Sequence, residues 1–182
     1  MGVSNVTGAK PQTGGACYRA TTATPTLPVS TSDALTDFAS MGYISDKGIV
    51  NSNSPASTNV KAFGGTNVLT TQTERPDTFK VEFLEVLDLN VLKTVYGETN
   101  VSGTSLTSGL TVKANGTELE ERAFVFDLIL RNGVAKRMVL PKAKISSISD
   151  ITYADGAAVG YEVTLEAFPD SSGNTHYEYI KG

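Results

Sequence analysis

The alternation of apolar and polar positions along the chain predicts short β-strands over most of its length. The clearest strand is expected at residues 78–86, where every second side chain from Phe79 to Phe83 is apolar. Residues 160–167 alternate in the same way. A period of two places one face of a strand in a core and leaves the other face in solvent.

Residues 122–131 are apolar on both faces, which is typical of a central strand. The Asn132-Gly133 dipeptide, a strong hairpin signal, leads from it into a strand at 134–140. Residues 143–149 either continue that strand or begin another. Shorter strands are expected at 16–20, at 42–50 around a turn at 46–48, at 60–65, at 66–73, at 110–114 before an Asn115-Gly116 hairpin turn, and at 175–180 after a turn at 170–174.

One helix is predicted, at about 88–96. Asp88 can cap the free amides of its first turn, and Gly97 can end it. Its apolar stripe consists of Leu89, Leu92, Val95 and Tyr96. A helix of about nine residues is too short to be stable in isolation, so we expect it to pack on the sheet.

The 182 residues fit one domain, and the pattern favours a mainly β fold, a sandwich or barrel with one short α-helix packed outside. Residues 1–35 are rich in Gly, Ser, Thr and Pro, which predicts an extended N-terminal arm before a single domain at 36–182. A polar, Asn- and Ser-rich stretch predicts a long inter-strand loop at about 47–59.

Composition places the chain among globular proteins, with 40% apolar and 19% charged residues. No apolar run approaches the roughly 18 to 20 residues that a membrane helix needs. The first fifteen residues are polar and small, which argues against a secretory signal. We therefore expect a soluble protein that acts without a membrane.

The net charge of −4 argues against a protein that grips nucleic acid by its phosphates, since such binding needs a basic stripe. The densest run of cations, residues 131–144, alternates with strand residues. We interpret it as a solvated strand face or a charged contact between subunits.

Candidate catalytic chemistry is sparse. One histidine, His176, and one cysteine, Cys17, provide neither a zinc site nor a Cys/His pair. Cys17 is expected to pack as a small hydrophobic residue. Glu118, Glu120 and Glu121 cluster after a turn, where a solvated loop is a better interpretation than a catalytic carboxylate pair. The sequence therefore predicts no enzyme, no metal and no cofactor.

Several segments in this order resemble one known family. Residues 41–48 read Met-Gly-Tyr-Ile-Ser-Asp-Lys-Gly, residues 61–65 read Lys-Ala-Phe-Gly-Gly, and residues 72–74 read Gln-Thr-Glu. Residues 79–97 combine a Phe-x-Val-x-Phe-x-Glu strand with a Leu-Lys-x-x-Tyr-Gly helix end, and residues 165–170 read Leu-Glu-Ala-Phe-Pro-Asp. Together they are similar to the major tail tube proteins of long-tailed bacteriophages of the actinobacteriophage type.

The resemblance implies a structural virion protein that polymerises as stacked, hexameric rings into the tail tube, through which double-stranded DNA passes without specific binding. It implies a β-sandwich or barrel whose sheets join around the ring, with terminal arms and a long loop bridging neighbouring rings. The implied partners are further copies of the chain and the tape measure, tail-tip or baseplate, and tail terminator proteins. The implied locations are the virion tail and, during assembly, the host cytoplasm.

Two sets of residues are candidates for these roles. Residues of the predicted arm and loop are the candidates for assembly contacts: Pro25, Pro28, Asp46, Lys47, Asn51, Asn53 and Pro55. Lys47 stands where the family often has an acid. Carboxylates on predicted strands are the candidates for the lumen: Glu82, Asp127, Glu162 and Glu166. Asp127, alone among apolar residues, is either a lumen or interface carboxylate or a core acid satisfied by a neighbour such as Arg or Tyr.

An alternative from another class is a monomeric β-sandwich module that binds or decorates a virion or cell surface. The absence of Trp weighs against a carbohydrate-binding version. A hydrolase on a β scaffold is the least favoured alternative, because His and Cys occur once each.

Overall fold

The computed structural model describes residues 5–12 and 15–182. Parts of the predicted N-terminal arm, 1–4 and 13–14, lie outside the described residues. The body is a nine-stranded antiparallel sheet with the main strand order β3-β2-β10-β11-β12-β7-β4. Its strands are β1 (Ala9–Pro11), β2 (Cys17–Ala20), β3 (Phe38–Ser40), β4 (Ile44–Asn53), β7 (Asp77–Phe83), β10 (Arg122–Leu130), β11 (Ala135–Ile148), β12 (Tyr161–Ala167) and β13 (Tyr177–Lys181).

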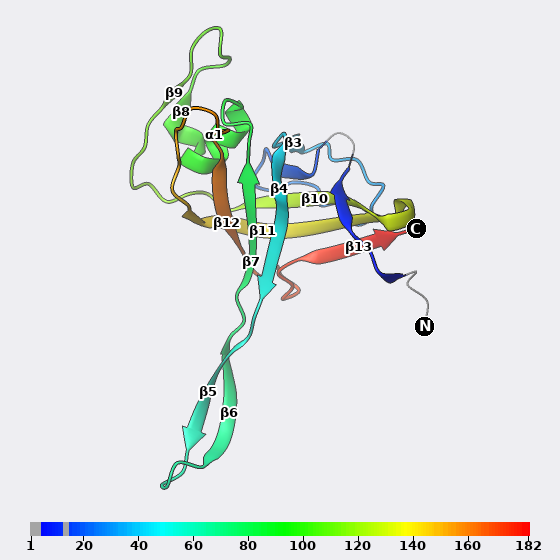
Figure 1. Cartoon of the computed structure of the whole chain (residues 1–182), viewed down its shortest axis with the longest axis vertical. Helices are drawn as coiled ribbons and strands as arrows, with labels where there is room; N and C mark the ends of the chain where they lie inside the picture. Colours follow the sequence, from blue (N-terminus) through cyan, green and yellow to red (C-terminus); the bar gives the residue numbers. More distant parts are fainter. Residues whose placement is uncertain (1–4, 13–14) are drawn as a thin grey trace.

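Two small hairpins lie outside this sheet. The first pairs β5 (Ala56–Lys61) with β6 (Asn67–Glu74), and the second pairs β8 (Val101–Ser102) with β9 (Thr111–Val112). Figure 1 shows them at opposite ends of the molecule, with β5 and β6 extending far from the body. Between β7 and β8 lie the α-helix α1 (Leu89–Tyr96) and a 3₁₀ turn, η2 (Glu98–Asn100), and a second 3₁₀ turn, η3 (Arg131–Gly133), joins β10 to β11.

The long strand β11 connects two parts of the sheet. One of its edges pairs with β10, while the other pairs first with β13, over Ala135–Val139, and then with β12, from Ala143 onward. Pro141, which has no backbone N–H to donate, lies between these two stretches of pairing. Residues 143–149 therefore continue the preceding strand, which resolves the two alternatives that the sequence left open.

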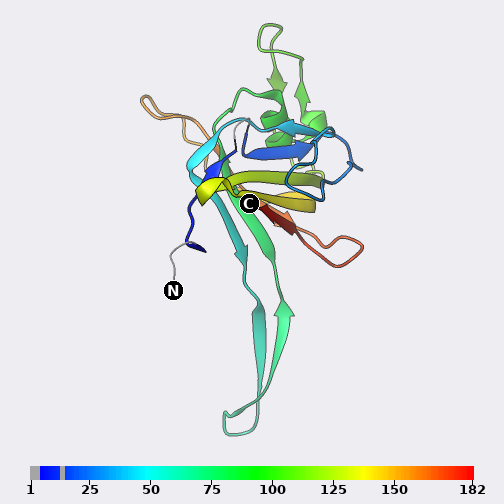
Figure 2. The same ribbon diagram turned by 90° about the vertical axis from the view of Figure 1, so that its right-hand side faces the viewer.

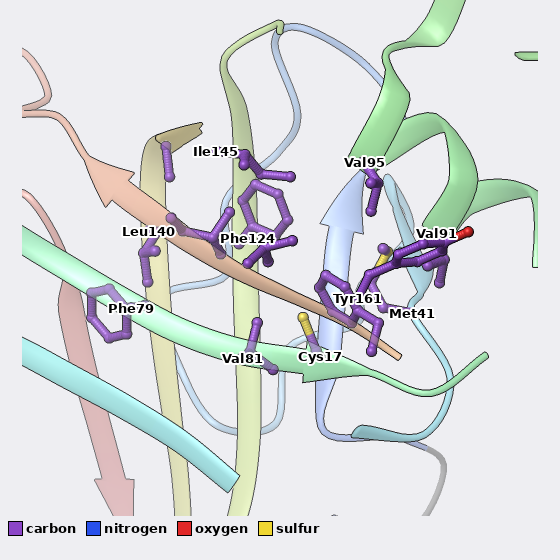
Figure 3. Packing of buried hydrophobic residues seen from close by; sticks show 14 of the residues in the cluster. Cys17, Met41, Phe79, Val81, Val91, Val95, Phe124, Leu140, Ile145 and Tyr161 are labelled. Atoms are coloured by element: carbon purple, nitrogen blue, oxygen red, sulfur yellow. The ribbon is translucent and has the colours of Figure 1, made fainter. Parts of the chain in front are cut away.

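The sheet folds over on itself to enclose the core. β7 and β10 are separated in the strand order by β11 and β12, yet the rings of Phe79 and Phe126 stack with centroids 5.7 Å apart. The strands therefore form two packed layers, as the mainly β sandwich prediction requires. Figure 3 shows Phe79 and Val81 of β7 facing Phe124 of β10 and Leu140 of β11 across this core.

The helix forms where the sequence predicts it and covers one end of the core. The Asp88 carboxylate accepts hydrogen bonds from the amides of Asn90 and Val91, and Gly97 follows the last turn with a φ of 99°. Val91 and Val95 point into the core beside Met41 (Figure 3). This packing provides the stability that so short a helix lacks alone.

The predicted loop at about 47–59 is wrong. β4 continues to Asn53 and β5 begins at Ala56, so most of these residues are extended and paired. The expected turn at 46–48 is instead a bulge within β4, where Gly48 has a φ of 71° and the pairing with β7 shifts between Ile44 and Ile49. The polar composition concealed β5 and the end of β4, because a ribbon with solvent on both faces needs no apolar alternation.

The boundary between an arm at 1–35 and a domain from 36 is also wrong. β1 and β2 both pair with β10, so strands of the predicted arm are part of the main sheet. Residues 21–37 lie against the body, and Pro28 is buried there. The Asn115-Gly116 hairpin is not formed either, because β9 pairs back to β8 and the Asn115 side chain exchanges two hydrogen bonds with that of Asn100.

Candidate assembly surfaces

The β5–β6 hairpin projects from the body without contacting it, as Figures 1 and 2 show from two sides. Every residue of both strands is exposed. Val60 and Leu69 are opposite each other across the pair, and Phe63 at the tip is fully exposed. A lone two-stranded hairpin is at best marginally stable in water, and its open edges and apolar side chains favour a partner.

The hairpin continues the ribbon that β4 and β7 form in the body. β4 enters it after Asn53 and β7 leaves it at Asp77, and these two residues are paired. The side chain of Asn53 accepts a hydrogen bond from Arg75 Nε at 2.6 Å, which closes the ribbon at this point. The direction of the hairpin is therefore set by β4 and β7.

A buried carboxylate fixes the base of the hairpin. Asp77 is 1% exposed and accepts hydrogen bonds from Asn51 Nδ2 at 2.8 Å and Thr175 Oγ1 at 2.6 Å. His176 Nδ1 contacts the same carboxylate, and its ring packs edge-on against Phe79. We call Asp77, Asn51, Thr175 and His176 the base cluster.

The charge of Asp77 is stabilised by these contacts. Burial by itself raises the pKa of this carboxyl, but hydrogen bonds from Thr175, His176 and Asn51 outweigh it and hold the pKa below its ordinary value. The cluster joins β4, β7 and the segment before β13, which are far apart in sequence. It therefore ties the base of the hairpin to the body by polar contacts.

The carboxylates predicted to face outward from β7 and β12 do so, but lysines balance them. Glu82 and Glu162 are paired across the two strands. Lys47 contacts Glu82 at 3.0 Å and Glu162 at 3.5 Å, and Lys80 contacts Glu162 at 2.8 Å. Hydrogen bonds from Lys80 and Ser149 are the main reason that the pKa of Glu162 falls to about 2.

Glu166 lies further along β12, with Lys144 of β11 opposite it. Lys144 itself pairs with Glu118. The outer faces of β7 and β12, together with Lys47 of β4, thus carry charges of both signs. We call this surface the mixed-charge face; it consists of Lys47, Lys80, Glu82, Glu162 and Glu166.

Asp127 is not available as a lumen carboxylate. It is 4% exposed, and its two oxygens accept hydrogen bonds from Arg137 Nε at 2.6 Å and from a terminal nitrogen of Arg137 at 2.7 Å. Arg137 also donates to the carbonyls of Ser30 and Asp33. The second interpretation, a core acid satisfied by an arginine, is the one that the structure shows, and the pair holds residues 21–37 on the body.

The predicted assembly residues occupy different settings. Asp46, Lys47 and Pro55 are exposed on or beside β4, while Pro25 is half-buried. Pro28 is buried within its own chain, so it cannot contribute an exposed contact in this conformation. Asp77 and Phe63 were not named from the sequence as candidates for assembly. For Phe63 a signal was available, because an aromatic residue shortly after Lys61 and directly before two glycines is typical of an exposed turn.

A groove of about 610 Å³ lies at the end of β4 and β7 opposite the hairpin. Tyr43, at its rim, is 78% exposed, and its amide donates to Glu85 Oε1 at 2.9 Å. Gly42 has a φ of 68°. A Cβ at this position would overlap the Glu85 carboxylate, so any larger residue would displace Glu85. The lining is Pro11, Gln12, Gly15, Ala16, Ser40, Gly42, Tyr43, Ile44, Glu85 and Asp88.

The structure offers little for catalysis. Cys17 is fully buried, and burial raises the pKa of its thiol, which keeps it protonated and unreactive. Within residues 5–12 and 15–182, no cluster of His, Cys, Asp and Glu could hold a metal ion. No helix in that same part of the chain has the length and apolar character to cross a membrane.

The fold and these surfaces define a β-sandwich structural protein with a projecting hairpin. The sequence matches the family described as phage tail tube protein over residues 14–182, nearly the whole chain, and the chain belongs to this family. It is therefore a non-enzymatic structural protein of the phage tail, as the resemblance predicted. Among curated proteins, none matches the sequence significantly.

Proposed function

We propose that the chain polymerises as stacked rings of six copies into the tail tube, and that the tube conducts DNA into the host during ejection. The observation that carries this proposal is the β5–β6 hairpin, which exposes Val60, Phe63 and Leu69 and, among the described residues, extends away from the body (Figure 1). A projection of this kind is stable when a neighbouring copy covers it.

The edges of the main sheet support growth within a ring. β3 and β4 lie at the two ends of the strand order, so each has one edge without a strand partner among the described residues. Open edges are templates for pairing with another chain. Pairing of such edges between copies would join the sheets into one continuous wall around a channel.

The mixed-charge face is our candidate for the channel wall. Lys47 and Lys80 are neutralised by Glu82 and Glu162, so the face presents no uncompensated cations that could hold phosphates. Glu166 adds a carboxylate to the same side of β12. Such a surface would let DNA slide without specific binding.

The remaining partners follow from the same proposal. A tube needs an initiating complex at the tail tip or baseplate, a tape measure protein inside, and a terminator at its end. The chain would meet them in the host cytoplasm during assembly. We expect the chain to contact copies of itself through its exposed hairpin and through Asp46, Lys47 and Pro55.

Electron microscopy tests the proposal directly. The purified protein, incubated at high concentration with and without isolated tail tips as seeds, should form tubes of uniform bore with six-fold symmetry in projection. A ring of another copy number would correct the hexamer alone. A protein that stays monomeric even with seeds, and that decorates the outside of virions, would support the surface-module alternative instead.

A further inference from the structure

The hairpin tip and the groove are complementary in charge, and both expose apolar side chains. The tip sequence from Lys61 to Gly65 presents a cation next to an aromatic ring that no other residue covers. The groove combines apolar walls with the carboxylates of Glu85 and Asp88, and none of its lining residues among the described ones is a lysine or arginine. Its volume lies within the roughly 300–1,000 Å³ of protein pockets that hold ligands, so a phenylalanine side chain fits easily.

The charges at both surfaces are free to pair with a partner. Within the described part of the chain, Lys61, Glu85 and Asp88 form no salt bridge. Glu85 accepts from the Tyr43 amide and Asp88 caps α1, and both contacts use neutral backbone donors. Neither carboxylate is therefore paired with a cation among the described residues.

The register of β4 and β7 separates tip and groove within one chain. Ile44 pairs with Phe83 at the groove end, whereas Asn53 pairs with Asp77 at the hairpin end. The tip lies beyond Asn53, at the far end of β5 and β6 (Figure 1). A chain cannot fold its tip into its own groove without breaking this ribbon, so the matching occupant is the tip of a second copy.

We propose that the hairpin tip of one copy docks in the groove of another, with Phe63 against Tyr43 and Ile44 and with Lys61 near Glu85 and Asp88. This inference rests on the proposed tube, for which it names the contact that joins successive rings. Because tip and groove lie at opposite ends of the subunit, the contact is head-to-tail and repeats without closing, which is the geometry of a growing filament.

Cysteine cross-linking between two single variants tests the contact. One batch carries Phe63→Cys with an affinity tag, and the other carries Tyr43→Cys. Phe63 and Tyr43 are both exposed, so the variants should fold, and Cys17 is buried and should not compete. Mixed tubes exposed to a mild oxidant should yield a tagged–untagged dimer on a non-reducing gel.

The matched control replaces Tyr43→Cys with Ile180→Cys, which is also exposed but lies on β13, outside the groove lining. It should give far less dimer. Tubes that form normally but cross-link Phe63→Cys equally to both positions, or to neither, would overturn the docking contact and leave the proposed tube intact. Wild-type protein that forms no tubes even with seeds would instead refute the proposed function itself.

A charge reversal provides a second readout. Lys61→Glu would place a third carboxylate beside Glu85 and Asp88 and should raise the protein concentration needed for assembly roughly ten-fold or more. Lys113→Glu, an exposed lysine outside the groove, is the control for the change in net charge. An equal effect of both reversals would count against the specific pairing.

Discussion

At the scale of single residues, two buried carboxylates organise different parts of the molecule. Asp77 sits at the base of the hairpin with three side-chain donors, and Asp127 forms a two-point ion pair with Arg137. Both are almost completely buried, and each depends on its partners to compensate for lost hydration. Changes at either position should therefore have effects beyond the loss of one contact.

Asp77→Asn should destabilise the protein by about 1–3 kcal/mol, because an amide cannot accept from all the donors that surround this position. The pH dependence should change as well. Since the folded pKa of Asp77 lies below its ordinary value of 3.8, its contribution is present above that pH and is lost as the pH falls through the folded pKa.

Urea unfolding between pH 3 and pH 7 measures both effects, the range being about that over which carboxylates titrate. Wild-type protein should lose stability at the acid end more steeply than Asp77→Asn. Asp46→Asn, an exposed carboxylate on β4, is the control and should behave like wild type. Parallel pH profiles for wild type and Asp77→Asn would show that Asp77 does not titrate as described.

Arg137→Met should cost about 3–5 kcal/mol, because it leaves the charge of Asp127 buried without a partner. For a chain of this size, each kcal/mol corresponds to a fall in Tm of about 2–4 °C. Thermal denaturation followed by circular dichroism gives the shift. The double variant Asp127→Leu with Arg137→Met should recover much of the loss, and a double variant as unstable as the single one would show that packing, rather than the unpaired charge, dominates.

At the scale of secondary-structure elements, the β5–β6 hairpin is separable from the body. Its strands are exposed throughout and pair with each other, while the core lies in the body. The same ribbon contributes to the core where β7 turns its apolar face inward, at Phe79, Val81 and Phe83. Assembly and folding therefore depend on different stretches of one continuous ribbon.

Replacing residues 56–73 with a short Gly-Ser turn should leave the stability of the body unchanged within about 0.5 kcal/mol, the range for surface changes remote from the core. It should abolish the formation of tubes. Urea unfolding and electron microscopy measure the two outcomes on one preparation. A truncated protein that still forms tubes of normal length would contradict the role given to the hairpin.

Local patterns allowed prediction of the elements that bury a face. Alternation located β7 and β12, a cap and a glycine located α1, and Asn132-Gly133 located the turn into β11. The strand expected at 66–73 matches β6, but most of β5 was assigned to a loop because polar residues fill both of its faces. β2 was assigned to an arm because it is short and flanked by turn-forming residues. Asp77 and His176 meet across about a hundred residues of sequence, a contact that no local pattern encodes.

At the scale of the whole molecule, membership of the phage tail tube family implies assembly with further copies of the chain. The body has its own core, yet two sheet edges, a groove and a hairpin remain open. Hydrogen exchange should make this visible. Amides of residues 56–74 should exchange within seconds in the monomer and become protected in tubes, because their outer edges are then covered.

Mass spectrometry of deuterium uptake in monomer and tube fractions measures this change, with β10 and β11 as internal references. Their amides pair within the chain and should be protected in both states. Equal uptake by residues 56–74 in the two fractions would show that the hairpin stays uncovered in the tube.

The continuity of the hairpin with β4 and β7 also has a mechanical consequence. A pull on the tip acts along the strand axis, and the seven residue pairs that join β7 to β12 run along that axis. Their hydrogen bonds lie across the direction of the pull, so they resist it together instead of opening one after another. In the proposed tube of stacked rings, tension would therefore pass from copy to copy through parallel ladders of hydrogen bonds.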